Sequence, residues 1–216
     1  MNFPRLYLLT DEKVLGDRPL IDTVESAVRG GVDIVQYRNK SKSIPEQIEE
    51  AGRLKERLDR HGVPLIINDH SKVAHAVRAA GVHLGQSDQP VSEVRAWLPT
   101  AWIGLSTHSL DQARDAVSAG ATYIGFGPIF STATKKSDLS PVVGTAQLRA
   151  LQEIAPLPVF SLGGITIGNV EDVLAAGASR VAVSSAILAA PDPELAAREF
   201  KERLDKKYFR RYASSP

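Results

Sequence analysis

The feature that most constrains the fold of this chain is a repeated unit in which the end of a helix leads directly into a buried strand. The unit recurs as the sequences AVRGG, AVRAAG, AVSAG and VLAAG, each followed by an apolar run. An Ala-Gly or Gly-Gly ending marks a helix C-terminus followed by a turn. Helices that alternate with strands predict a parallel sheet, because parallel strands need crossover connections.

Eight runs of apolar and β-branched residues are nearly continuous, as expected for strands that are buried on both faces. They predict strands at residues 5–10, 34–38, 64–69, 81–85, 102–107, 123–130, 159–165 and 180–187. Eight units in 216 residues leave 27 residues for each (216/8), enough for one strand and one helix. We therefore predict an α/β fold, a single-domain (β/α)8 TIM barrel over residues 1–216 with a basic C-terminal tail at about 206–216. The alternative is an open, doubly wound sheet.

Composition excludes several classes of partner and chemistry. The net charge is +1, so there is no global field to gather nucleic acid. The chain has no cysteine, which excludes disulfides, thiolate metal sites and cysteine nucleophiles. The N-terminal apolar stretch, Leu6 to Leu9, is too short for a signal peptide or a membrane span. We expect a cytoplasmic protein without nucleic-acid or membrane partners.

In a barrel of this type the functional residues lie at the carboxyl ends of the strands. The second strand ends in Gln36-Tyr37-Arg38-Asn39-Lys40. Because side chains alternate along a strand, Gln36, Arg38 and Lys40 should share one direction, toward the barrel mouth. The alternative is a solvated strand end.

Two aspartates follow neighbouring strands. Asp69 ends the third strand and Asp88 follows the fourth, beside Asn68 and Ser87 respectively. Two converging carboxylates suit Mg²⁺, which takes one or two carboxylates together with waters and phosphate oxygens. Alternatively, each aspartate caps the helix that follows it.

The fifth strand ends in Leu105-Ser106-Thr107-His108-Ser109, and alternation gives Ser106 and His108 the same direction. His108 is either a general acid or base or a histidine that orients other groups. No G-x-S-x-G nucleophile motif occurs.

Two further segments suit phosphate binding. After the sixth strand, a long loop carries Thr132, Thr134 and Lys135, and long loops in compact domains are usually functional. The alternative for this loop is an exposed turn. After the last two strands, Gly163-Gly164 allows close backbone approach, and Ser184-Ser185 opens a short helix. One cationic site and one neutral donor site would let an enzyme expel pyrophosphate while holding a second, phosphorylated substrate.

In these segments the chain resembles the thiamine phosphate synthase family. The matching segments run in family order across nearly the whole chain: QYRNK at 36–40, ND at 68–69, GVHLGQSD at 81–88, GLSTH at 104–108, GFGPIF at 125–130, TATK at 132–135, GGI at 163–165 and VS at 183–184. The resemblance implies a transferase that condenses 4-amino-5-hydroxymethyl-2-methylpyrimidine pyrophosphate with 4-methyl-5-(2-hydroxyethyl)thiazole phosphate, giving thiamine phosphate and pyrophosphate.

The resemblance also implies a role for each site residue. The pyrimidine pyrophosphate would be bound by Gln36, Arg38, Lys40, Asn68, Ser106 and Lys135, of which Lys135, Arg38 and Ser106 would be catalytic. Asp69 and Asp88 would hold one Mg²⁺ per active site. The thiazole phosphate would be bound by Thr132, Thr134, Gly164, Val183 and Ser184. A homodimer is possible.

The implied mechanism is dissociative: pyrophosphate leaves first, and the thiazole nitrogen then captures the pyrimidine methyl cation. Two alternatives stay open. A sister family, the thiazole tautomerases, is similar around Ser106-Thr107-His108-Ser109 and would use His108 for proton transfer, but its members tend to lack the aspartate pair. A non-catalytic paralogue that binds thiamine precursors would be expected to have lost Arg38, Lys135 or an aspartate, and all are present.

Overall fold

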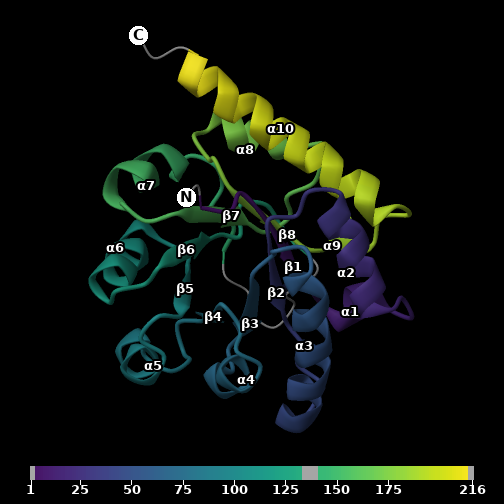
Figure 1. The fold of residues 1–216 in the computed structure, drawn as a ribbon. Helices are drawn as coiled ribbons and strands as arrows, with labels where there is room; N and C mark the ends of the chain where they lie inside the picture. Colours follow the sequence, from purple (N-terminus) through teal and green to yellow (C-terminus); the bar gives the residue numbers. More distant parts are fainter. Residues whose placement is uncertain (1–2, 133–140, 214–216) are drawn as a thin grey trace.

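The computed structural model describes residues 3–132 and 141–213, and these residues form a closed barrel of eight parallel strands in sequence order (Figure 1). The strands are β1 (Leu6–Leu9), β2 (Ile34–Tyr37), β3 (Leu65–Asn68), β4 (Gly81–Leu84), β5 (Trp102–Thr107), β6 (Tyr123–Phe126), β7 (Val159–Leu162) and β8 (Val181–Val183). β1 pairs with both β2 and β8, which closes the sheet. The predicted barrel is confirmed, and the open-sheet alternative is wrong.

Helices surround the barrel between successive strands. They are α1 (Glu12–Leu15), α2 (Leu20–Arg29), α3 (Ile44–Asp59), α4 (Ser71–Ala76), α5 (Val91–Trp97), α6 (Leu110–Ser118), α7 (Leu148–Ile154), α8 (Val170–Ala175), α9 (Ser185–Leu188) and α10 (Pro193–Ala213). In the described part of the chain, no helix is both long and apolar enough to span a membrane. The backbone of the basic segment, as far as Ala213, continues α10.

All eight predicted strands are present, but most end earlier than the apolar runs do. β6 ends at Phe126, before Pro128, which has no N–H to donate to a neighbouring strand. β8 ends at Val183, because Ser184 is already the N-cap residue of α9. The apolar residues after Phe126 therefore belong to the loop that follows β6, and those after Val183 belong to α9.

Alternation along each strand separates two cores. On β1, Leu6 and Leu8 pack outward against the helices, whereas Tyr7 points into the barrel. The interior cluster comprises Tyr7, Ile34, Ile66, Tyr123, Phe160 and Ala182. The described part of the barrel interior is therefore filled by side chains, and a cavity opens at the carboxyl end of the strands.

The first strand and the last helix contact each other at the outside of the barrel. α10 packs along α2 and α8 (Figure 1). Asp33 accepts hydrogen bonds from the backbone N–H groups of Arg5 and Leu6 at 3.0 and 2.9 Å, and it pairs with Lys201 Nζ at 2.5 Å. Phe200 of α10 is 1% exposed. The last helix thus covers the side of the barrel where β1 meets β8.

Candidate active site

A cavity of about 660 Å³ opens at the carboxyl ends of the strands. Its lining comes from β1, β2 and β5 through β8 and the loops that follow them. Among the residues that line it are Asp11, Arg38, Ser106, His108, Thr132, Gly163, Gly164, Val183 and Ser184. The lining is mostly apolar with a few polar groups, which is typical of small-molecule sites.

Arg38 is held at the cavity by the end of β1. Its guanidinium forms an ion pair with Asp11, whose side chain is 3% exposed, and its backbone N–H donates to Thr10 Oγ1 at 2.9 Å. Asp11 in turn caps α1 by accepting from Lys13 N at 2.9 Å. A guanidinium that is paired with a buried carboxylate keeps its planar group of donors in one place for an anion. The sequence analysis missed Asp11, although an acidic residue directly after a buried strand was a signal of this role.

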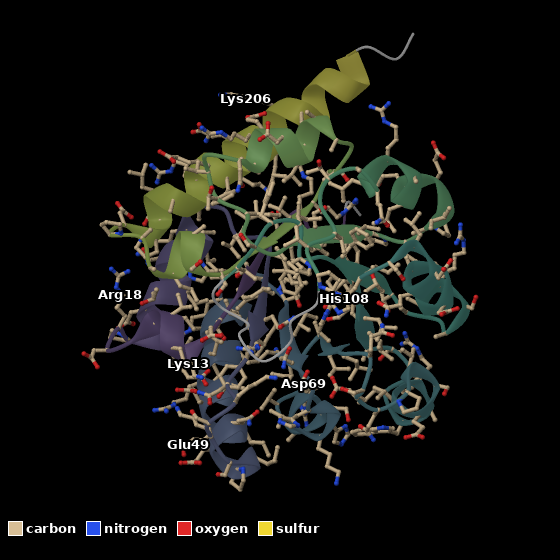
Figure 2. The ribbon with its side chains drawn as sticks, turned by 180° about the vertical axis from the view of Figure 1, so that it is seen from behind. Lys13, Arg18, Glu49, Asp69, His108 and Lys206 are labelled. Atoms are coloured by element: carbon tan, nitrogen blue, oxygen red, sulfur yellow. The ribbon has the colours of Figure 1, made fainter. Side chains whose placement is uncertain are left out.

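Asp69, which is labelled in Figure 2, directly follows β3, and its side chain interacts with that of Asp88, which follows β4. Neither acts as the cap of the helix that follows: the N-cap residues are His70 for α4 and Pro90 for α5. Asp88 Oδ2 instead accepts from Gly85 N at 2.6 Å. Asp69 has φ +60°, a left-handed conformation that is uncommon for residues other than glycine. The capping alternatives are wrong.

The environment of Asp69 disfavours its charged form. Burial raises the pKa of Asp69, and the negative charge of Asp88 raises it further, while Lys40 acts in the opposite direction. A divalent cation between them would remove the repulsion and suit the oxygen donors. No group of three or more His, Cys, Asp or Glu side chains able to hold a metal occurs among the described residues, so protein ligands alone would leave room for water or phosphate oxygens.

The opposite side of the cavity presents neutral donors. Gly163 and Gly164 have φ of +94° and +64°, which turns their backbone sharply after β7. Ser184 Oγ is buried and has no hydrogen-bond partner among the described residues. A buried hydroxyl without a partner is costly, so a ligand oxygen is a natural partner for it.

His108 also lines the cavity and is labelled in Figure 2. Its Nδ1 lies 2.5 Å from the carbonyl oxygen of Gly127. A carbonyl can only accept, so Nδ1 carries the proton and Nε2 is left as an acceptor in the neutral ring. This geometry orients the ring and is compatible with either role considered for it.

A chain of hydrogen bonds runs beneath the cavity through the barrel interior. Gln36 Nε2 donates to Tyr7 Oη at 2.9 Å, and Tyr7 Oη lies 2.9 Å from Tyr123 Oη. His83 contacts Tyr123 Oη through Nδ1 at 3.1 Å and Ser106 Oγ through Nε2 at 3.0 Å. The sequence analysis missed Tyr7, His83 and Tyr123 as polar groups, because each lies alone in an apolar strand.

Comparison with known proteins shows the family. The family model for thiamine monophosphate synthase matches residues 6–187. The chain is 44% identical over 197 residues to a thiamine-phosphate synthase of Chloroflexus aurantiacus, covering 91% of each chain. It is 44% identical over 195 residues to that of Shouchella clausii, covering 90% of this chain and 93% of the relative. The chain belongs to the thiamine monophosphate synthase family.

A solved structure agrees with that assignment. The chain is similar to the thiamine phosphate pyrophosphorylase of Pyrococcus furiosus, with a TM-score of 0.86 and 32% identity over 94% of this chain and 96% of the other. The predicted membership of the thiamine phosphate synthase family is thus confirmed. The tautomerase and paralogue alternatives are not favoured by these relatives.

For a member of the thiamine monophosphate synthase family, the structure brings most of the predicted site residues to one end of the barrel. Six line the cavity: Arg38, Ser106, Thr132, Gly164, Val183 and Ser184. Gln36 is buried below it, and Asn68, Asp69 and Asp88 lie at the ends of β3 and β4. Lys40 is exposed, and its charge reaches Asp69. Thr134 and Lys135 lie outside the described residues.

Proposed function

We propose that the chain transfers the pyrimidinylmethyl group of 4-amino-5-hydroxymethyl-2-methylpyrimidine pyrophosphate to 4-methyl-5-(2-hydroxyethyl)thiazole phosphate, forming thiamine phosphate and pyrophosphate. The reaction would take place in the cytoplasm, without nucleic acid or a membrane. Membership of the family supports the reaction type. The proposal includes assembly as a homodimer.

One observation supports the proposal: two unlike groups of polar residues, each suited to an anion, lie at the same end of the barrel. The first region contains Arg38, which lines the cavity, and, at the ends of β3 and β4, the carboxylate pair Asp69 and Asp88, which would make the region cationic only with a bound metal ion. The neutral region contains Gly164 and Ser184. A pyrophosphate that must depart needs strong charge stabilisation, whereas a phosphate monoester that keeps its charge needs only steady hydrogen bonds.

Asp69 and Asp88 would hold Mg²⁺, and the fit rests on their mutual repulsion and on oxygen-only chemistry. When bound, Mg²⁺ would act as a Lewis acid that stabilises negative charge on pyrophosphate oxygens. Lys40, with its charge close to Asp69, would bind the same group. Asn68 at the end of β3 would add an amide contact to this substrate.

The other residues would bind and orient the two substrates. Arg38, held by Asp11, would donate to the pyrophosphate, and Lys135 would stabilise the charge that grows on it as the bond breaks. Gln36 and Ser106 would bind the pyrimidine. Thr132, Thr134, Gly164, Val183 and Ser184 would fix the thiazole phosphate, so that its ring nitrogen faces the carbon released by pyrophosphate. Because that nitrogen has a free lone pair, bond formation requires no protein base.

The direct test is to incubate the purified protein with both precursors and Mg²⁺ and to measure products. We expect thiamine phosphate and pyrophosphate in equal amounts, and no product when either precursor is left out. Chelation of the metal should stop turnover, and added Mg²⁺ should restore it. Absence of thiamine phosphate under all these conditions would reject the proposed function.

His108 gives a separate test of the tautomerase alternative, because its Nε2 is an acceptor at the cavity. A positioned acid or base is typically worth about 10²–10⁴-fold in rate. For a synthase, His108→Ala should change coupling to an already aromatic thiazole phosphate only slightly. Tautomer conversion that is lost in His108→Ala, together with no coupling in either protein, would instead identify a tautomerase.

A further inference from the structure

The buried series of hydrogen bonds beneath the cavity, from Gln36 to Ser106, has a direction that follows from its donors and acceptors. Tyr7 Oη contacts the amide nitrogen of Gln36, which can donate but cannot accept. The Tyr7 hydroxyl therefore directs its own hydrogen to Tyr123 Oη, 2.9 Å away. Burial raises the pKa values of both tyrosines, so both hydroxyls keep their protons.

The same reasoning continues to the cavity. Tyr123 accepts from Tyr7, so its hydrogen goes to His83 Nδ1 at 3.1 Å. With Nδ1 as an acceptor, a neutral imidazole carries its proton on Nε2, which donates to Ser106 Oγ at 3.0 Å. Ser106 then has its own hydrogen to offer to a ligand. The opposite end of the chain leaves Gln36 Oε1 as an acceptor.

The barrel makes room for this chain at two glycines. His83, Gly104 and Tyr123 stand at the same level on three successive strands. A Cβ on Gly104 would lie 2.4 Å from His83 Nδ1 and 2.2 Å from Tyr123 Cζ. A Cβ on Gly125, which is in register with Ser106, would lie 3.1 Å from His83 Cε1. Because Gly104 and Gly125 have no side chains, the His83 and Tyr123 rings fit into the space beside them.

We propose that Tyr7, Tyr123 and His83 are positioning residues that hold Gln36 with its oxygen as the acceptor and Ser106 as a donor, and so select an aminopyrimidine over the corresponding oxopyrimidine. This inference rests on the proposed function. An amino group next to a ring nitrogen offers a donor and an acceptor, which a carboxamide matches with two hydrogen bonds. An oxo group next to a ring N–H offers the reverse pattern and would set oxygen against oxygen at Gln36.

Selectivity depends on the whole series of hydrogen bonds from Gln36 to Ser106. A carboxamide without these partners could turn over and bind the reversed donor and acceptor pattern of the oxopyrimidine. In this barrel, turning Gln36 would place an oxygen against Tyr7 Oη. Every later bond, including the tautomer of His83, would then have to reverse as well. Removing the Tyr123 hydroxyl interrupts this series of hydrogen bonds. The Tyr7 hydroxyl is then free to donate to Gln36, so the carboxamide can turn at lower cost.

The test uses Tyr123→Phe with Tyr37→Phe as the matched control, because the Tyr37 hydroxyl donates to Glu50 outside the barrel. The readout is the inhibition constant of the 4-oxo pyrimidine pyrophosphate divided by the KM of the 4-amino substrate. A site built for one hydrogen-bonding pattern rejects the other strongly, so this ratio should be about 100 or more in the unaltered protein. We expect it to fall about tenfold or more in Tyr123→Phe and to stay unchanged in Tyr37→Phe. General damage to the pocket would move both constants together and leave the ratio as it was.

A second measurement starts from the unaltered protein, so its first result does not depend on a variant that could fail to fold. ¹⁵N NMR of histidine-labelled, unaltered protein should show the His83 ring with its proton on Nε2, and Tyr123→Phe should shift that signal toward a mixture of tautomers. A proton on Nδ1 in the unaltered protein, or an unchanged ratio in Tyr123→Phe, would overturn the inference. Failure of the proposed function would look different, because the unaltered protein would then make no thiamine phosphate.

Discussion

At the scale of single residues, Asp69 combines a functional charge with an unusual backbone conformation. Its φ of +60° suits Asn or Asp better than Ala. Asp69→Asn should therefore abolish Mg²⁺-dependent turnover while keeping the fold, and should not lower the melting temperature without metal, since it removes the repulsion with Asp88. Asp69→Ala should lose turnover too, and about 1–2 kcal/mol of stability as well. Thermal melting and steady-state rates distinguish these effects, and near-normal rates at saturating Mg²⁺ would reject the metal site.

Ser184 and Lys135 should respond to mutation in opposite ways. The Ser184 hydroxyl is buried without a partner among the described residues, so Ser184→Ala should raise the KM for the thiazole phosphate by about tenfold, the value of roughly one hydrogen bond. Its kcat should change little, because that phosphate keeps its charge throughout.

Lys135→Ala should lower kcat more than it raises KM, because charge on pyrophosphate grows in the transition state. Steady-state kinetics with each substrate varied in turn would show the contrast, and a pure KM effect in Lys135→Ala would mean that the lysine only gathers substrate.

At the scale of elements, the loops after β6 and β7 support each other at the mouth. Phe130 N donates to Gly163 O at 3.0 Å, and a Cβ on Gly164 would lie 2.5 Å from Ser131 O. The mouth of the barrel is thus built by contacts between loops as well as by the strands that carry them.

Gly164→Ala should therefore shift both loops. We expect a loss of about 2 kcal/mol or more, from the left-handed backbone and the clash together, and a higher KM for the thiazole phosphate. Gly120→Ala is a matched control: Gly120 has φ +82°, but a Cβ added there would meet no heavy atom of the described residues within 4 Å. The control should lose stability through its backbone alone and keep its KM. Equal KM changes in both variants would remove the loop contact as the cause.

At the scale of the whole molecule, α10 stabilises the barrel from outside without forming part of its mouth. Phe200 is 1% exposed in the packing of α10, where Lys201 also reaches Asp33. Phe200→Ala should lower the free energy of unfolding by about 3–5 kcal/mol, the usual cost of emptying an aromatic site. Denaturant unfolding measures the loss. Kinetics well below the melting temperature should show KM values within error of the unaltered protein, and a large KM change would mean that α10 shapes the site.

Local sequence patterns were sufficient for the order of the elements and for much of the mouth. The helix-end repeat and the eight apolar runs depend on residues within one element, so they predicted the closed barrel. Residues at or near the carboxyl ends of these runs were expected at the barrel mouth, and Arg38, Ser106, Gly164 and Ser184 line one cavity there. Strand ends were less predictable, because the apolar residues beyond Phe126 belong to a loop and those beyond Val183 belong to α9 instead of the sheet.

Only the tertiary structure revealed what lies inside the barrel. A lone histidine or tyrosine in an apolar strand looks the same whether it faces a helix or a partner 40 residues away, as His83 faces Tyr123. Their meeting depends on the register of β4, β5 and β6 and on the space left by Gly104. The burial of Asp11 against Arg38 likewise follows from the pairing of β1 with β2. Local chemistry determined which groups the chain carries, and the closure of the sheet decided which of them touch.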